Sequence, residues 1–211
     1  GLPSSFIYKG DEMLEGAIRP NFWRAPTLND DVDGNALPKW LNAGFDDLTI
    51  VPKLITTDRV DDSRVTITVL LDMVNKKGEC VITTEQVYEI NGFADVIISN
   101  NVCPNDVVAT FPKIGIQLLL PKQYDRIRYF GKDTENYPDR NSSGKTNVYK
   151  TNAQDMFELH VEPQDNGNRS ETRWVAVTDR DGKGFFVTGT ELFNFSIYEY
   201  YDEILDICEE Y

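Results

Sequence analysis

The sequence predicts an all-β protein whose antiparallel strands pack as a sandwich. Three observations lead to this fold class. Apolar and polar residues alternate with a period of two in several stretches, which indicates strands with one buried face. Residues that form turns separate these stretches at intervals of about 8 to 12 residues. Helical patterns are confined to two short segments of the 211-residue chain.

The clearest strands are expected between residues 64 and 99. Residues 64–71 carry valine or isoleucine at positions 65, 67 and 69 and threonine at positions 66 and 68, so one face is apolar. Residues 80–90 and 93–99 are also expected as strands. The pair Asn91-Gly92 between them favours a two-residue type I′ turn, because both residues tolerate positive φ. We therefore expect three consecutive antiparallel strands.

The second half of the chain repeats this pattern. Residues 179–184 are rich in turn formers and indicate a hairpin loop. Strands are expected at residues 114–120, 124–130, 174–178, 185–188 and 193–197. Helices are expected at residues 37–44, which have an early proline and a final glycine, and in the acidic tail at residues 201–211. No change of composition divides the chain, so residues 1–211 are predicted to form one domain.

The charge composition excludes several classes of function. The chain has 35 Asp and Glu against 21 Lys and Arg, a formal net charge of −14, and no run of basic residues. We therefore expect no nucleic-acid partner, because phosphate backbones would be repelled. No stretch approaches the roughly 20 apolar residues of a membrane helix. We expect no membrane partner either.

Histidine and cysteine are too few for several kinds of site. His160 is the single imidazole, and it lies in an alternating stretch that favours an ordinary strand residue. The spacing of Cys80, Cys103 and Cys208 fits neither a zinc site nor a redox pair. We therefore predict no metal site and no cofactor in this chain. Adjacent carboxylates elsewhere in the sequence are expected to be solvated.

Three segments combine aromatic, charged and turn-forming residues without a regular repeat. They are residues 19–31, 128–140 and 162–174. Arginine among aromatic residues often stacks and pairs with a carboxylate, which fixes a loop. Aromatic faces beside Asp, Asn and Arg are also suited to sugar binding. The residues alone leave both interpretations open.

The three segments resemble motifs of the small-chain, C-terminal domain of glycoside hydrolase family 2 β-galactosidases. The family motif Asn-Phe-x-Arg-Ala-Pro-x-Asp-Asn-Asp stands at residues 21–31 as Asn-Phe-Trp-Arg-Ala-Pro-Thr-Leu-Asn-Asp-Asp. The family element Glu-Asn-Tyr-Pro-Asp-Arg occupies residues 135–140, after Lys132-Asp133-Thr134 in place of an Arg-Gly-Pro-like turn. A third element, Pro-Gln-Glu-Asn-Gly-x-Arg with a later Arg-Trp, matches residues 163–174. The resemblance covers nearly the whole chain in order and rough spacing.

This resemblance implies a fold, an activity and partners. The fold is expected to be an antiparallel supersandwich similar to galactose mutarotase, truncated at its C-terminus because the family continues for several more strands. In such enzymes it packs beside a (β/α)₈ barrel, which supplies the acid/base and nucleophile glutamates of a retaining mechanism. This chain would then contain no catalytic residue and would be an incomplete domain. Its partners would be the other domains of the parent β-galactosidase and a β-galactoside or related sugar.

The resemblance also implies roles for individual residues. In the family, the loop that follows the first motif borders the mouth of the active site, and the matching loop is residues 31–37. The candidates for lining the mouth are Arg24, Asn29, Asp30, Asp31 and Asp33. A structural pairing of Arg24 with Asp30 is the stronger alternative.

Residues of the second and third motifs are expected to support the scaffold. They are Glu135, Asn136, Tyr137, Arg140, Arg169, Arg173 and Trp174. Glu135 and Arg140 are expected to satisfy one another's charge. The Arg173-Trp174 pair is expected to combine stacking with an ion pair.

Three functions are compatible with these patterns. The leading one is a non-catalytic domain of a β-galactosidase that shapes the mouth of the substrate site. The alternative is a stand-alone carbohydrate-binding module of the mutarotase-like fold. A mutarotase-like epimerase is third and is suggested by the shared fold alone. That chemistry typically uses a histidine with a glutamate as acid and base, and a single histidine in an ordinary strand disfavours it. The exact glycoside, homo-oligomerisation and a cytoplasmic or periplasmic location in a bacterium stay open.

Overall fold

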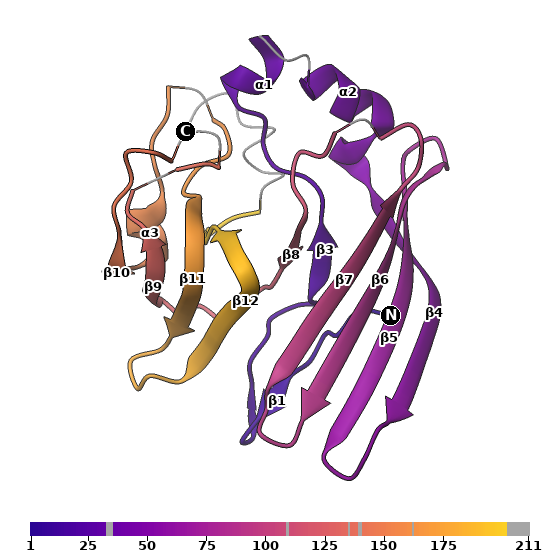
Figure 1. Ribbon diagram of the computed structural model, residues 1–211, viewed down its shortest axis with the longest axis vertical. Helices are drawn as coiled ribbons and strands as arrows, with labels where there is room; N and C mark the ends of the chain where they lie inside the picture. Colours follow the sequence, from indigo (N-terminus) through magenta and orange to yellow (C-terminus); the bar gives the residue numbers. More distant parts are fainter. Residues whose placement is uncertain (33–35, 109, 135, 139–140, 162, 202–211) are drawn as a thin grey trace. The chain divides into compact units, whose positions relative to one another are not determined.

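The computed structural model describes residues 1–32, 36–108, 110–134, 136–138, 141–161 and 163–201 (Figure 1). The chain divides into two compact units. The first unit comprises residues 1–23 and 29–119, and the second comprises residues 24–28 and 120–211. Antiparallel strands dominate both units, so the predicted all-β class is confirmed. The likeness to galactose mutarotase and the single incomplete domain stay predictions.

The first unit is built on a four-stranded antiparallel sheet in the order β4-β5-β6-β7 (Figure 1). Its strands are β4 (Thr49–Arg59), β5 (Arg64–Val74), β6 (Cys80–Asn91) and β7 (Val96–Pro104). The three strands predicted from alternation between residues 64 and 99 are therefore confirmed. The smaller elements are β1 (Ile7–Tyr8), β2 (Asp11–Glu12), β3 (Arg19–Asn21), α1 (Leu28–Val32), α2 (Ala36–Ala43), the 3₁₀ helix Phe45–Asp47 and β8 (Gly115–Gln117). Strand β8 is shorter than the strand expected at residues 114–120.

The turn between β6 and β7 differs from the predicted type I′ turn. Residue Asn91 pairs with Asp95 through backbone hydrogen bonding, so three residues rather than two reverse the chain. The positive φ falls on Ala94, at 65°, two residues after Gly92. The reason is the Asn91 side chain, whose Oδ1 accepts hydrogen bonds from the backbone N–H groups of Phe93 and Asp95. Asn91 organises this turn through its side chain. The Asn-Gly pair alone does not distinguish such a turn from a two-residue type I′ turn.

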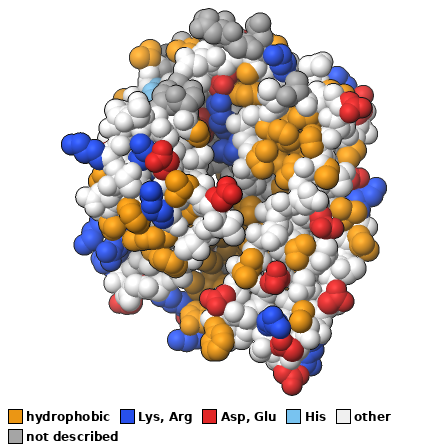
Figure 2. Space-filling model, in the orientation of Figure 1, with side chains coloured by type: hydrophobic (Ala, Val, Ile, Leu, Met, Phe, Trp, Pro, Cys, Tyr) orange, Lys and Arg blue, Asp and Glu red, His pale blue; other side chains and the backbone are white. Residues whose placement is uncertain are grey.

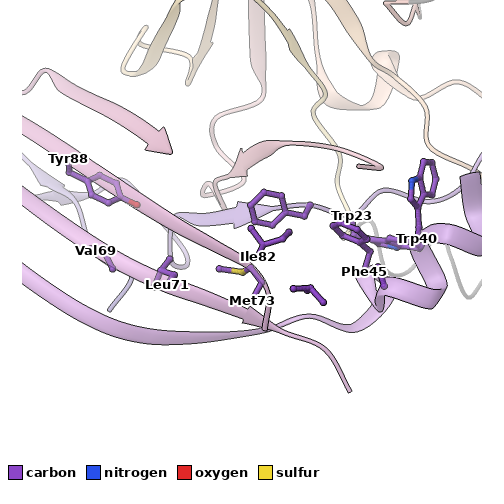
Figure 3. Close-up of a cluster of buried hydrophobic side chains, with 11 residues drawn as sticks. Trp23, Trp40, Phe45, Val69, Leu71, Met73, Ile82 and Tyr88 are labelled. Atoms are coloured by element: carbon purple, nitrogen blue, oxygen red, sulfur yellow. The ribbon is translucent and has the colours of Figure 1, made fainter. Parts of the chain in front are cut away.

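The core of the first unit lies between the sheet and α2. Along β5, Val69, Leu71 and Met73 are buried, and they alternate with partly exposed residues. Figure 3 shows Trp40 from α2 and Phe45 beside this apolar face. Helix α2 confirms the helix expected at residues 37–44, with Gly44 after its last residue in the left-handed region at φ 82°. A Cβ at this glycine would lie 2.6 Å from the Asn75 Cβ, so close packing also requires glycine.

Strand β4 was not predicted, and its surroundings explain why. Every one of its residues except Ile50 is exposed, so the apolar and polar positions do not alternate in burial. Pro52 sits at a β-bulge, where the register with β5 shifts between Pro52 and Leu54. A proline inside a strand is tolerated at a sheet edge, because its missing N–H is not needed there. Strand β4 is an edge strand of the four-stranded sheet.

The hairpin between β4 and β5 contains a carboxylate with a shifted pKa. The Ser63 hydroxyl and the Ser63 backbone N–H donate to Asp61 Oδ1, at 2.7 and 2.8 Å, and Arg64 Nε donates to Oδ2 at 2.8 Å. These bonds, with the hydroxyl as the largest cause, lower the pKa of Asp61 from 3.8 to about 2. They favour the ionised form.

We expect Asp61 to titrate near pH 2 in the folded protein, as followed by NMR of its carboxyl carbon. Because the folded pKa lies below the unfolded value of 3.8, the hairpin bonds stabilise the fold above pH 3.8 and are lost as the pH falls toward 2. Ser63→Ala should raise the pKa of Asp61 toward 3.8. A wild-type midpoint already near 3.8 would contradict the hydrogen-bond assignment.

The second unit is built on another four-stranded antiparallel sheet, in the order β10-β9-β11-β12 (Figure 1). Its strands are β9 (Arg126–Lys132), β10 (Thr146–Thr151), β11 (Arg169–Thr178) and β12 (Gly184–Phe195). One face of this sheet is buried through Ile127, Tyr129, Val175 and Val177. Strands predicted at residues 124–130, 174–178, 185–188 and 193–197 lie wholly or largely within β9, β11 and β12.

The structure corrects the expectation for His160 and does not test the helix expected at the end of the chain. His160 lies in an irregular segment between the short helix α3 (Ala153–Met156) and β11, not in a strand. The Asn152 side chain caps α3 by accepting from the Asp155 N–H, so the chain is committed to a helical turn before the alternating residues begin. The helix expected at residues 201–211 falls almost entirely outside the described residues. No helix in the described ranges is long and apolar enough to cross a membrane.

Candidate functional site

The three motif segments meet in the second unit. Ala25 belongs to the first motif, Asn136 and Tyr137 to the second, and Asp165 and Asn168 to the third. Hydrogen bonds join the first motif to the third and the second motif to the third, although more than 100 residues separate Ala25 from Asp165. These bonded residues of the three motifs, with the residues hydrogen-bonded to them, form one cluster, which we call the motif cluster.

Asn136 is the centre of the motif cluster. Its Nδ2 donates to the carbonyl oxygens of Asp133 and Thr134, at 2.9 and 2.7 Å. Its Oδ1 accepts from the backbone N–H of Ser170 at 2.9 Å and also from the Ser170 hydroxyl. Its backbone N–H donates to the Asn168 carbonyl, and its own carbonyl accepts from Asn168 Nδ2. At 4% exposure, this residue ties the loop after β9 to the start of β11.

The turn before Asn136 contains a residue in an unusual backbone conformation. Thr134 has φ of 35°, and a positive φ is uncommon for a residue other than glycine. Asp133 secures this turn by accepting from the Lys145 N–H through Oδ1 and donating its own N–H to the Lys145 carbonyl. Asn136 is bonded both to this turn, at Asp133 and Thr134, and to Ser170 on β11.

Asp165 joins all three motifs. Its backbone N–H donates to the Ala25 carbonyl at 3.2 Å, and its carbonyl accepts from the Tyr137 hydroxyl at 2.8 Å. Its carboxylate accepts from the Tyr198 hydroxyl at 3.0 Å. At 4% exposure the carboxylate faces protein rather than solvent. This arrangement organises the scaffold, since the described contacts of Asp165 are with the protein itself.

The next two residues of the third motif are equally constrained. Asn166 is fully buried and its Nδ2 donates to the Gln164 carbonyl at 3.1 Å. Gly167 has φ of 69°, and a Cβ there would lie 2.9 Å from the Met156 carbonyl oxygen. Glycine is required by both the backbone conformation and the space. Both residues therefore serve the packing of the cluster.

The arginines of the third motif have separate environments. Arg169 is 5% exposed, and its Nη2 lies 3.8 Å from Glu158 Oε1 while its Nη1 donates to the Asn168 carbonyl. Arg173 Nη1 donates to the Glu171 carbonyl at 2.8 Å, and its guanidinium lies over the Phe130 ring at 4.8 Å. The predicted stacking of Arg173 is therefore present, but with Phe130. No ion pair of Arg173 is found among the described residues.

Trp174 also stacks, but with a residue that no sequence pattern pairs with it. Its ring lies 5.6 Å from the Phe186 ring at an interplanar angle of 29°. The two residues face one another from β11 and β12, where Trp174 pairs with Thr188 and Ala176 pairs with Phe186. The predicted partners Glu135 and Arg140 lie outside the described residues. Their pairing stays a prediction.

The candidates for the substrate mouth lie in both units. Arg24 is half-buried in the second unit, and its Nη1 donates to the Ala25 carbonyl at 3.3 Å. Asn29, Asp30 and Asp31 form part of α1, which belongs mostly to the first unit. Asp33 lies outside the described residues. The pairing of Arg24 with Asp30 stays a prediction, as does the role of these residues at a substrate mouth.

Three members of the motif cluster are not singled out by the sequence motifs: Ser170, Tyr198 and Tyr200. Ser170 is 1% exposed and binds Asn136, while the Tyr198 hydroxyl donates to the Asn166 carbonyl at 2.8 Å. The Tyr198 and Tyr200 rings stack at 5.2 Å. Both tyrosines follow the alternating residues 193–197, and their aromatic spacing is a usable signal. Within the described ranges, no group of three or more His, Cys, Asp or Glu residues is placed to hold a metal ion.

Comparisons with known proteins agree on one family. A family model described as beta galactosidase small chain matches residues 1–210. The chain is 28% identical over 190 residues to a beta-galactosidase of Priestia megaterium, covering 88% of this chain and 17% of that protein. It is 32% identical over 197 residues to a beta-galactosidase of Lactobacillus delbrueckii subsp. bulgaricus, covering 91% and 19%. It is 28% identical over 221 residues to a beta-galactosidase of Vibrio cholerae, covering 98% of this chain and 20% of that protein. The chain thus spans about a fifth of the length of these relatives.

Proposed function

The chain belongs to the beta galactosidase small chain family, and from this premise we propose that it is one domain of a β-galactosidase. The proposed enzyme hydrolyses terminal non-reducing β-D-galactose residues and belongs to the glycoside hydrolases. The observation that carries the proposal is the family match over residues 1–210, together with relatives that are about five times longer and are named beta-galactosidases.

Catalysis is assigned to the other domains of the parent protein. The carboxylate of the motif cluster, Asp165, is buried and accepts a hydrogen bond from Tyr198, which suits a scaffold better than a general acid or nucleophile. A retaining glycosidase needs two carboxyl groups about 5 Å apart and facing the sugar. In this proposal a barrel domain of the parent supplies that pair, and this chain itself needs no cofactor.

The proposed contribution of this chain is to border the substrate site. Helix α1 exposes Asn29 and Asp31, and short polar side chains of this kind can hydrogen-bond sugar hydroxyls. Arg24 and Asp30 stand beside them in the sequence and are proposed to position this segment. The relatives named above are enzymes rather than isolated modules, which favours this function over a stand-alone carbohydrate-binding module. Their bacterial sources favour a bacterial cytoplasm or periplasm as the location.

We expect the isolated 211-residue chain to hydrolyse no chromogenic β-galactoside, while the whole protein that contains it does so. In the whole protein, Asp31→Ala should raise KM several-fold with little change in kcat, because a lost sugar contact at the mouth weakens binding in both ground and transition states. Asp46→Ala, in the 3₁₀ helix, is a matched control that should leave both constants unchanged.

Each part of this proposal can be contradicted separately. Turnover by the isolated chain, surviving removal of host β-galactosidase, would place catalytic residues within it. A whole protein that shows no β-galactosidase activity would reject the proposed enzyme. If Asp31→Ala and the control have the same KM as the wild type, the substrate-mouth assignment of α1 is wrong.

A further inference from the structure

Four basic side chains come together on the outer face of the sheet in the second unit. Arg126 and Arg128 are two residues apart on β9 and therefore point to the same side. Lys150 on β10 is the register partner of Arg128. Arg180 follows the end of β11, whose last residue, Thr178, is the register partner of Arg126. Figure 2 shows Lys and Arg side chains gathered over the side where β9 and β10 lie in Figure 1.

These four residues line one hollow. Its volume is about 360 Å³, and Thr151, Thr178 and Asp179 also contribute to its walls. This volume falls within the range of small-molecule sites, about 300 to 1,000 Å³. Arginine, lysine and threonine side chains supply hydrogen-bond donors, and Arg126 and Arg128 are forked donors suited to oxyanions. We call this feature the basic hollow.

The positive charge of the basic hollow is only partly neutralised within the described part of the chain. Arg126, Arg128, Lys150 and Arg180 are all exposed, and none forms an ion pair with a described residue. Asp179 in the wall offsets one of the four positive charges, and its Oδ1 accepts from the N–H groups of Asp181 and Lys183, each at 2.9 Å.

This concentration of cations contrasts with the rest of the sequence. The chain carries a net charge of −14, yet four of its 21 basic residues surround one depression with a single carboxylate in the wall. The sequence has no run of basic residues, but strand pairing brings together residues that are up to 54 positions apart in it.

We propose that the basic hollow binds a small polyvalent oxyanion, either inorganic phosphate or sulfate or the same group carried by a sugar ester. Two guanidinium forks and an ammonium group can share one tetrahedral anion, as charge-assisted hydrogen bonds are the strongest polar contacts of this kind. A hollow of this volume has room for a small anion of this kind. A neutral sugar would not require four positively charged side chains at one place. This inference is independent of the proposed β-galactosidase function.

The test is calorimetric titration of the intact protein with inorganic phosphate, inorganic sulfate, galactose 6-phosphate and galactose at low ionic strength. We expect the two inorganic anions to bind and galactose not to bind at the hollow. In Arg128→Gln/Lys150→Gln, the dissociation constant for phosphate should rise about tenfold or more, because two charge-assisted contacts are removed. Galactose 6-phosphate binding more tightly than phosphate would identify a sugar ester as the source of the anion, and the reverse order would identify the free ion.

A matched control removes the same charge from the same unit. Lys122 and Lys145 are exposed and outside the hollow, so Lys122→Gln/Lys145→Gln should keep the wild-type dissociation constant within about twofold, as expected for distant screened charges. Thermal unfolding of both double variants checks that they remain folded. Equal losses in both variants, no phosphate or sulfate binding by the wild type, or binding of a hexaglutamate peptide without binding of phosphate would each overturn the proposal.

Discussion

Replacing Asn136 with alanine is expected to destabilise the protein by about 3 kcal/mol or more, since each buried partner left unsatisfied costs about 1 to 3 kcal/mol. The substitution removes four side-chain hydrogen bonds at a residue that is 4% exposed. The carbonyl groups of Asp133 and Thr134 lose a donor, and the N–H and hydroxyl of Ser170 lose an acceptor. Ser170 is 1% exposed, so solvent does not readily replace the bonds that its N–H and hydroxyl lose.

Urea unfolding of the variant, followed by tryptophan fluorescence, measures this effect as a lower midpoint at an unchanged m-value. Asn141→Ala is the matched control. Asn141 is partly exposed and its Nδ2 makes longer bonds, at 3.1 Å to Glu171 and 3.4 Å to Ser170, so its loss should cost about 1 kcal/mol or less. If both variants lose the same free energy of unfolding, Asn136 is not the centre of the motif cluster.

Gly184→Ala is the second substitution expected to have a large effect, with a loss of about 3 kcal/mol, as is typical of overpacking that the backbone must absorb. Gly184 begins β12 and is the register partner of Thr178. A Cβ there would overlap the Val177 carbonyl oxygen and lie 2.7 Å from the Thr178 Cα. Both obstacles are backbone atoms of β11, so a rotamer change cannot relieve them.

Gly182→Ala separates this collision from the backbone preference of glycine. Gly182 lies in the same hairpin, with φ of 84°, and an alanine methyl group there would have open space for 4 Å around it. Its substitution should lower the free energy of unfolding by about 1 to 2 kcal/mol, the cost of placing an alanine in the left-handed conformation. Thermal unfolding of the two variants under one set of conditions makes the comparison. Equal losses would show that the backbone of β11 moves to accommodate the Gly184 side chain.

The strands with one buried face could be predicted from the sequence, and those without one could not. Strand β5 has one buried face, which carries Val69, Leu71 and Met73. Apolar residues are therefore needed at every second position, and this alternation is visible in the sequence. Strand β4 contains Pro52 and is exposed on both sides, and β10 is polar and at the edge of its sheet. Periodicity reports burial rather than hydrogen bonding, so edge strands leave a weak pattern.

The candidate site shows a similar division. Asn136 and Tyr137 could be selected from the sequence because they are adjacent and match a family motif. Their partner Ser170 could not, since a single serine has no distinctive local pattern, and Tyr198 is indicated only by its aromatic spacing to Tyr200. The basic hollow could not be anticipated for the same reason: Arg128 and Lys150 become neighbours only through the register of β9 and β10.

The edge strand β4 also bears on how the isolated chain behaves in solution. An open edge offers unpaired N–H and C=O groups to a second copy, and apolar residues such as Leu54 and Ile55, at 55% and 51% exposure, would strengthen that association. The Pro52 bulge interrupts the row of donors, and Lys53 places a charge beside it that is held 3.2 Å from Asp72. These features oppose strand-to-strand aggregation.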